Sequence, residues 1–229
     1  RDWSSDVCSS DLNLGRQLRF ANWLPFARDA DTEAQWNLPE ERACSRDLVQ
    51  TSPVATGAIG TRATSIIGTG LTLQARLHAF ELGLTEQEAA EWQATTERRF
   101  HMWARRQWAD VAVRQTFYQL QDLAIRSHDT SGDVFALLTS KPRSGWPFRL
   151  AVQMIEADRV CNPNGRADGP LENGNTLVNG VEMLPDGEPV RIHLAKFHPG
   201  SLPIAGSNSW QEIDFIGPNG RRQVLHLRS

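Results

Sequence analysis

The sequence predicts an α+β fold in which helices come first and a largely antiparallel β-sheet follows. Up to about residue 125, apolar residues recur every three or four positions, which is typical of amphipathic helices. From Asp133 onward the apolar spacing changes to two, which is typical of strands with one buried face. The two patterns occupy separate halves of a 229-residue chain that is 40% hydrophobic, and no linker divides them. We therefore expect a single α+β unit with its own core.

The first predicted helices lie on either side of Thr51-Ser52. A short mixed-charge helix is expected over Glu40–Gln50, after a loop rich in Trp and Pro that includes Trp36 and Pro39. Ser52 before Pro53 is a cap followed by proline at the first helical position, and Gly68 supplies the stop. This predicts a second helix over Pro53–Ile67. Its glycines, Gly57 and Gly60, favour close packing against another backbone.

A strand and a long helix are predicted next. Gly70–Gln74 alternates like a strand, and Thr85 to Glu88 forms a capping box that starts a helix. One face of this helix carries an apolar stripe, which we interpret as buried core in preference to a ligand-binding surface. The stripe consists of Ala89, Trp92, Thr96, Phe100 and Trp103.

A further helix is expected to follow Asp110, which is a suitable N-cap. Its predicted apolar face is Val113, Phe117, Leu120 and Ala124, and it should end before the turn Asp129–Gly132. After this turn the alternating pattern predicts strands, and Pro185-Asp-Gly187 predicts a hairpin turn between two of them. The predicted strands are Val134–Leu138, Phe148–Ile155, Leu177–Leu184, Val190–Phe197, Trp210–Ile216 and Gln223–Leu227.

The sequence also supports a prediction for each end of the chain. Residues 1–12 have neither helical nor strand periodicity and back-translate readily into a sequencing adapter, so we expect a non-native tail there. At the other end, the chain stops directly after the strand pattern Gln223–Leu227. We therefore expect residues 13–229 to be one α+β domain that is truncated at its C-terminus.

Composition excludes several classes of protein. A net charge of -3 is neither the basic excess of a protein that grips duplex DNA nor the acidity of a disordered tail. The three cysteines, Cys8, Cys44 and Cys161, are far apart and form no CxxC pair, so neither a disulfide framework nor a zinc site is indicated. No apolar run approaches the roughly 18 residues of a membrane helix. No GxSxG, GxGxxG or P-loop motif occurs.

The most plausible catalytic pattern is the carboxylate pair Glu156 and Asp158. With a histidine of the sheet, the pair would suit a metal-dependent hydrolase, which is the alternative function we retain. The simpler interpretation is a solvated strand end that is salt-bridged to Arg159. His193 and His198 are five residues apart, which places them on opposite faces of a strand, so they should not share a metal. No catalytic, cofactor or metal residue is assigned on these grounds.

A second alternative is a DNA-binding module in which arginines contact phosphates and tryptophans stack on bases. Its candidate residues are Arg42, Arg46 and Arg62. The simpler interpretation is that these are surface arginines in ion pairs with the nearby Glu40, Glu41 and Asp47.

Four separated stretches, in order, resemble the lambda-type family of phage portal proteins. No single stretch is diagnostic, but their common order over roughly residues 40–227 is specific. The stretches are Arg42–Pro53 running into Gly57–Ile59 and Ile67–Gln74; Trp92–Trp103 with Phe117, Leu120 and Ser131–Phe135; Gln153–Arg159; and Val178–Glu182 with Asp186–His193 and Val224–His226.

The resemblance implies a structural subunit and not an enzyme. The family's proteins form a homo-oligomeric ring, expected here to be a dodecamer, at the unique capsid vertex, where the ring is the conduit for DNA packaging and ejection and the head–tail connection. The implied partners are the terminase large subunit, the major capsid or scaffold protein, a head–tail connector protein, and duplex DNA passing non-specifically, with no cofactor and no membrane. The implied location is the portal vertex of the virion, after assembly in the bacterial cytoplasm. This chain would correspond to the outer wing region, with the channel-lining parts beyond Ser229.

Overall fold

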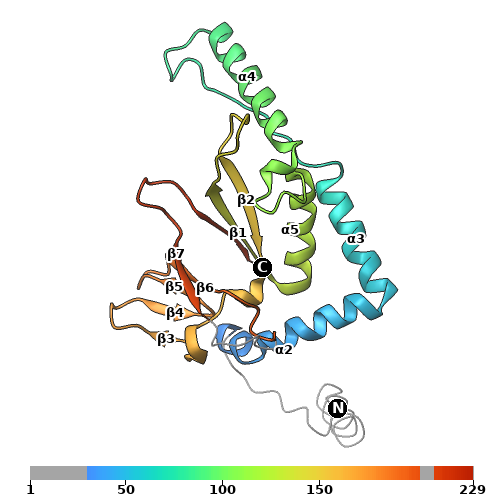
Figure 1. The fold of residues 1–229 in the computed structure, drawn as a ribbon, viewed down its shortest axis with the longest axis vertical. Coiled ribbons are helices and arrows are strands. Elements are labelled where there is room, and N and C mark those ends of the chain that lie inside the picture. Colours follow the sequence, from blue (N-terminus) through green and yellow to red (C-terminus); the bar gives the residue numbers. More distant parts are fainter. Residues whose placement is uncertain (1–29, 202–208, 229) are drawn as a thin grey trace, which may run out of the picture. The chain divides into compact units, whose positions relative to one another are not determined.

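The computed structural model describes residues 30–201 and 209–228, and of residues 30–37 only the backbone. The expected tail at residues 1–12 and most of the Trp- and Pro-rich loop lie outside the described residues. Residues 39–229 form one compact unit. Its helices precede two antiparallel sheets, as Figure 1 shows, which confirms the predicted α+β class. No helix in the described ranges has both the length and the apolar character needed to cross a bilayer.

The first described helix, α2, covers Ala30–Thr51 and is longer than the sequence predicts. The expected loop around Trp36 and Pro39 was wrong, because Pro39 lies inside the helix. A proline removes one backbone donor from a helix, and the flanking Ala, Glu, Gln and Leu residues are strong helix formers. Local propensity therefore outweighs one breaker at this position.

Helix α3 covers Pro53–Ile67, as predicted. The Ser52 hydroxyl accepts a hydrogen bond from the Ala55 N–H at 3.4 Å, and Gly68 ends the helix at a φ of 56°. The helix lies alongside α5 and buries Ala63 and Ile67 (Figure 1). The expected close backbone approach at its glycines was wrong within this chain, because a Cβ at Gly57 would meet nothing within 4 Å and one at Gly60 only the tip of Arg126. That face of α3 is open.

The predicted strand at Gly70–Gln74 was wrong, because the structure has no strand there. Side chains take the place of a neighbouring strand, because the Gln121 amide accepts from the Leu71 N–H at 2.8 Å and donates to the Leu71 carbonyl at 3.3 Å. The Glu97 carboxylate likewise accepts from the Ala75 N–H at 2.9 Å. The alternation in the sequence could not indicate that side chains, and not a second strand, hold this segment.

Helix α4 covers Glu86–Ala104 and begins with the predicted capping box. The Thr85 N–H donates to the Glu88 carboxylate at 2.9 Å, and the Glu88 N–H donates to the Thr85 hydroxyl at 3.2 Å. The predicted stripe is buried only in part, since Ala89 and Trp103 are buried but Trp92 is 51% exposed. The C-terminal half of α4 packs against α5 and the sheet, whereas its N-terminal half extends beyond them (Figure 1).

Helix α5 covers Phe117–Ser131 and starts later than predicted. Its N-cap is Thr116, which forms a capping box with Gln119, and its stop is Gly132. Asp110 instead closes the preceding turn, where its carboxylate accepts from the N–H groups of Ala112, Arg114 and Gln115 at 2.9–3.3 Å. Val113 lies in this turn at a φ of 58° and is not on the helix face. An aspartate that caps a turn and one that caps a helix look alike in sequence.

The strands form two antiparallel sheets instead of one. The three-stranded sheet has the order β2-β1-β8, and the five-stranded sheet has the order β3-β4-β5-β6-β7. The predicted strand Leu177–Leu184 is two strands, because Asn179 and Gly180 turn the chain at φ values of 47° and 79°. The bounds are β1 Asp133–Ser140, β2 Leu150–Ile155, β3 Gly169–Pro170, β4 Thr176–Val178, β5 Val181–Met183, β6 Pro189–Ala195, β7 Trp210–Asp214 and β8 Val224–Arg228, with short 3-10 turns η1 at Gln107–Ala109, η2 at Ala157–Arg159 and η3 at Pro163–Gly165.

The predicted hairpin turn joins β5 to β6. The Leu184 N–H donates to the Glu188 carbonyl at 2.8 Å, and Gly187 adopts a φ of 89°. The turn at Pro185–Gly187 is therefore confirmed.

Two apolar clusters lie on opposite faces of the three-stranded sheet. Phe135 and Leu137 of β1 point into a cluster shared with the five-stranded sheet, which includes Ile192 and Leu194. The alternate residues of β1 face the helices, where Trp103 packs on Phe117 with ring centroids 4.8 Å apart. Because β1 contributes residues to both clusters, this strand is the centre of the unit.

We predict that Gly180→Ala destabilises the protein more than Gly187→Ala. Both glycines have positive φ, so each alanine should cost about 1–2 kcal/mol of backbone strain. At Gly180 the added Cβ would also lie 2.3 Å from the Cys161 backbone nitrogen, whereas at Gly187 it meets open space. The overpacking should add about 1–3 kcal/mol to the loss in the free energy of unfolding, measured by urea titration. Equal losses for the two variants would contradict the packing.

Candidate functional site

A cluster of charged side chains surrounds Arg42 of α2. Arg42 is 7% exposed, and its Nη2 donates to Asp133 Oδ2 at 2.8 Å. Its Nε donates to the Ser131 carbonyl at 3.0 Å. Ser131 ends α5 and Asp133 begins β1, so Arg42 ties α2 to the junction between the last helix and the central strand.

Asp158 of η2 is the second anion of this cluster. It forms an ion pair with Arg46 and lies 3.7 Å from Arg42 Nη1. Because Arg42 and Arg46 are four residues apart, both project from one face of α2. The cluster thus contains two guanidinium groups and two carboxylates, so their positive and negative charges are equal in number.

Two histidines complete the cluster. His226 Nε2 of β8 lies 2.9 Å from Asp133 Oδ1, and its ring stacks on Phe135 at 4.1 Å between centroids and 16° between planes. His198 Nε2 lies 3.3 Å from Asp158 Oδ2, and its Nδ1 accepts from the Gly200 N–H at 2.9 Å. Since Nδ1 is an acceptor, the neutral ring carries its proton on Nε2 and donates it to Asp158.

The surroundings of Asp133 shift its acidity. Burial alone would raise the pKa of Asp133, but the hydrogen bond and charge of His226 and the charge of Arg42 outweigh it, so the pKa lies below its ordinary value. The carboxylate is therefore stabilised in its ionised form, which is the form that pairs with Arg42.

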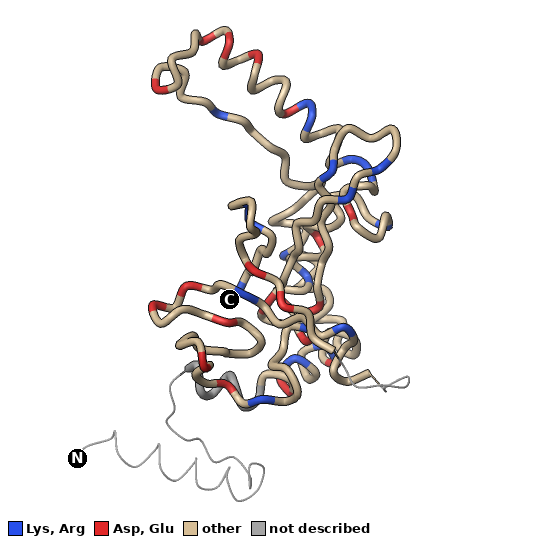
Figure 2. The backbone as a smooth tube through the Cα atoms, turned by 60° about the vertical axis from the view of Figure 1, so that its left-hand side comes forward, with Lys and Arg blue, Asp and Glu red and all other residues tan. Residues whose placement is uncertain are grey.

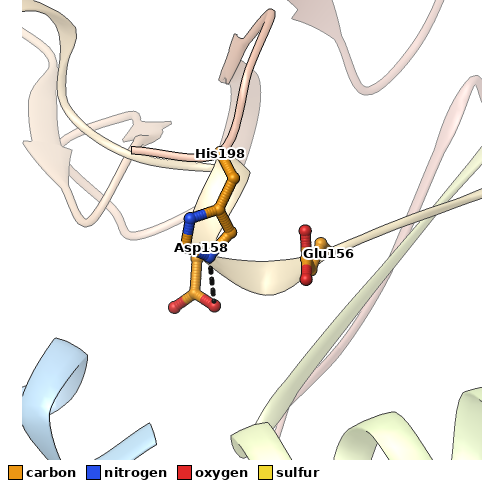
Figure 3. Close-up of side chains that lie close together, drawn as sticks. All are labelled: Glu156, Asp158 and His198. Carbon is orange, nitrogen blue, oxygen red and sulfur yellow. Dashed lines mark hydrogen bonds and ion pairs between the residues drawn. The ribbon is translucent and has the colours of Figure 1, made fainter. Parts of the chain in front are cut away.

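The carboxylate pair seen in the sequence acquires a histidine in the structure. Figure 3 shows Glu156, Asp158 and His198 together, and their ligand atoms lie within 4.8 Å of one another. His198 comes after β6 and not from a strand, so strand spacing did not reveal it. The group is a poor cation site as it stands, because two arginines already neutralise Asp158 and both nitrogens of His198 are hydrogen-bonded.

Several expected partners were wrong. Arg159 does not pair with Asp158 but donates to the carbonyls of Ala195 and Lys196, each at 3.0 Å. Arg42 and Arg46 were expected to pair with nearby acids of their own helix, yet their partners are Asp133 and Asp158. These partners lie about a hundred residues away, beyond what a local pattern can indicate. The remaining candidate, Arg62, pairs with Asp129 at 3.2 Å.

This pairing weakens the DNA-binding interpretation of the three arginines. Two of them are held by carboxylates inside the fold, and only Arg62 has a largely exposed side chain. Phosphate recognition needs guanidinium groups that are free to face a ligand. The cluster is thus an internal cross-link between elements.

A separate polar group holds the loop before β4 against the five-stranded sheet. The buried Glu182 carboxylate accepts from the Asn173 and Asn175 amides at 2.8 and 2.5 Å. Burial alone would raise the pKa of Glu182, but these hydrogen bonds and the charge of Arg191 hold it below its ordinary value. His193 is also buried, with its Nε2 3.7 Å from a Glu182 carboxylate oxygen.

The fold and the cluster together define an α+β structural unit whose buried charges connect its own elements. The family model described as "Phage portal protein, lambda family" matches residues 16–229, and the chain belongs to this family. It is also similar to "Portal protein B" of Escherichia phage lambda, with 26% identity over 217 residues. That alignment covers 93% of this chain and 39% of the relative, so the chain spans well under half the length of this relative.

We predict that Arg42→Ala is strongly destabilising. Removing one partner of a buried ion pair leaves an uncompensated charge, here at Asp133, and typically costs about 3–5 kcal/mol. The control is Arg126→Ala, since Arg126 forms an exposed pair with Asp122 one helical turn away and should contribute about 0.3–0.5 kcal/mol. Urea unfolding of both variants measures the difference. A loss of under 1 kcal/mol at Arg42 would show that the pair does not hold α2.

We predict a pH dependence of stability that Asp133→Asn removes. Because the folded pKa of Asp133 is below its unfolded value, its contribution is present above about pH 4 and is lost as the pH falls through the folded pKa. The difference in unfolding free energy between wild type and Asp133→Asn should therefore shrink as the pH falls below about 4. Chemical unfolding between neutral and acidic pH measures it. A difference that stays constant would contradict the role of the ionised carboxylate.

Proposed function

We propose that this protein is a structural subunit of the phage portal ring at the unique capsid vertex. The observation that carries the proposal is the family match over residues 16–229, which includes all the helices and strands described above. The ring would be the conduit for DNA packaging and ejection and the connection between head and tail. In this proposal residues 13–229 form the outer wing of the subunit and have no catalytic role.

The partners proposed for the full ring follow from the same family. They are further copies of the chain in a dodecamer, the terminase large subunit, the major capsid or scaffold protein and a head–tail connector protein. The ring would assemble in the bacterial cytoplasm and remain at the portal vertex of the virion. Duplex DNA would pass without sequence-specific contact.

The net charge of the chain fits a protein that lets DNA slide past better than one that binds DNA tightly. A protein that neutralises many phosphates binds DNA tightly through counterion release. This chain has a net charge of -3, and Arg42 and Arg46 are paired internally. A wall that slides past DNA should avoid such neutralisation.

The test of this function is the state of assembly. We expect the whole protein that contains this segment to form closed rings of about twelve subunits, visible by native mass spectrometry and electron microscopy. A whole protein that stays monomeric at high concentration would contradict the proposal. Metal-dependent hydrolysis that is lost in Asp158→Ala would favour the alternative, a metal-dependent hydrolase built on Glu156, Asp158 and His198.

A further inference from the structure

The helix-facing side of the three-stranded sheet is only partly covered. A cavity of about 560 Å³ lies between this face and helices α4 and α5, with Phe100, Val134, Ala136 and Leu138 in its lining. Leu225 and Leu227 of β8 also line it and are 40% and 53% exposed. β8 is an edge strand of the sheet, so the cavity is open along this side. Its volume is in the range that takes several apolar side chains.

Arginines surround this groove. Arg99 and Arg222 line it directly. The chain from residue 98 to residue 114 carries five arginines and only one acid, Asp110. Figure 2 shows these blue positions gathered at the C-terminal half of α4 and the turn after it. The groove is therefore apolar in its floor and basic at its rim.

The N-terminal end of α4 and the segment before it carry acidic and exposed apolar residues, which would complement the basic, apolar groove. Residues 77–92, which we call the arm, contain Glu81, Glu86, Glu88 and Glu91 and no Lys or Arg. Figure 2 shows the red positions at this end of the helix. The arm also carries exposed apolar side chains, namely Phe80 at 96%, Leu82 at 58%, Leu84 at 37% and Trp92 at 51%. Acids at a helix start favour the helix dipole, but the dipole does not account for exposed aromatic residues.

The arm cannot enter the groove of its own chain. Glu86 begins α4 and Arg99 lies thirteen residues further along the same continuous helix. At 1.5 Å per residue, the helix holds them about 20 Å apart. A second copy of the chain can bring an arm to the groove.

We propose that the arm of one subunit docks in the groove of the next subunit. The exposed apolar residues of the arm would cover the open floor along β8, and its glutamates would face Arg99 and Arg222. Because arm and groove are different surfaces, the contact is heterologous, and repetition of such a contact forms a ring when the rotation between copies closes. The inference rests on the proposed ring and assigns the surfaces that build it.

Cross-linking tests the contact directly. In a background with Cys8, Cys44 and Cys161 changed to serine, one variant carries Phe80→Cys and another carries Leu225→Cys. A bismaleimide should cross-link a mixture of the two to dimers and leave each variant alone uncross-linked. The double variant should give a ladder of oligomers. As the matched control, Glu188→Cys lies on the exposed β5–β6 turn and should not cross-link to Leu225→Cys.

Charge reversal provides the second measurement. Changing Glu81, Glu86 and Glu91 to lysine keeps the capping residue Glu88 and should weaken association about tenfold or more. Arg99→Glu with Arg222→Glu should weaken it similarly, and mixing the two variants should restore assembly. Changing Glu172, Asp186 and Glu188 to lysine gives the same change in net charge away from the arm and should have little effect.

The outcomes separate this inference from the proposed function. Rings that assemble without a cross-link from Phe80→Cys to Leu225→Cys would overturn the arm contact and keep the portal subunit. A chain that neither associates nor cross-links would overturn both. Cross-links and restored assembly in the mixed charge variants would support the contact.

Discussion

The buried guanidinium of Arg42 is the constraint on which the rest of the unit depends. A charge that is 7% exposed must have anionic partners, since an unpaired ion inside a protein is very costly. Asp133 stands at the start of the central strand, and Asp158 stands just after the strand that pairs with it. The position of α2 relative to the three-stranded sheet is therefore set by two carboxylates, and each carboxylate has a histidine as a further partner.

The sequence predicts elements well where the determining contacts are local. Ser52 and Gly68 bound α3, and Thr85 with Glu88 starts α4, because caps involve residues a few positions apart. Predictions fail where tertiary contacts decide. The extended segment at Leu71 resembles a strand, but its hydrogen-bonding partner is a glutamine side chain fifty residues away. The single sheet expected from the alternation is two sheets, since periodicity does not indicate which strands pair.

The contacts within the candidate site could be predicted from the sequence even less than the secondary structure. Two arginines four residues apart on α2 were visible in the sequence, and so were the carboxylates at 156 and 158. The ion pairs between them could not be predicted from the sequence, because Arg46 and Asp158 are 112 residues apart and no local pattern links them. The position of His198 depends on how the chain leaves β6, which strand spacing does not describe. The sequence thus predicted which charged residues could form a site, whereas their ion-pair partners depended on the tertiary fold.

The distribution of charge and apolar surface has a consequence for assembly. Inside the unit, arginines are matched by carboxylates, which leaves them little capacity to attract DNA. At the surface, Glu86, Glu88 and Glu91 lie in the first turns of α4 and Arg98 and Arg99 lie nearer its end, and apolar residues lie exposed beside each group. A rigid helix keeps the two ends apart, so they cannot satisfy each other within one chain. Surfaces that are complementary but separated in this way favour contact between successive copies, which is the geometry that a closed ring requires.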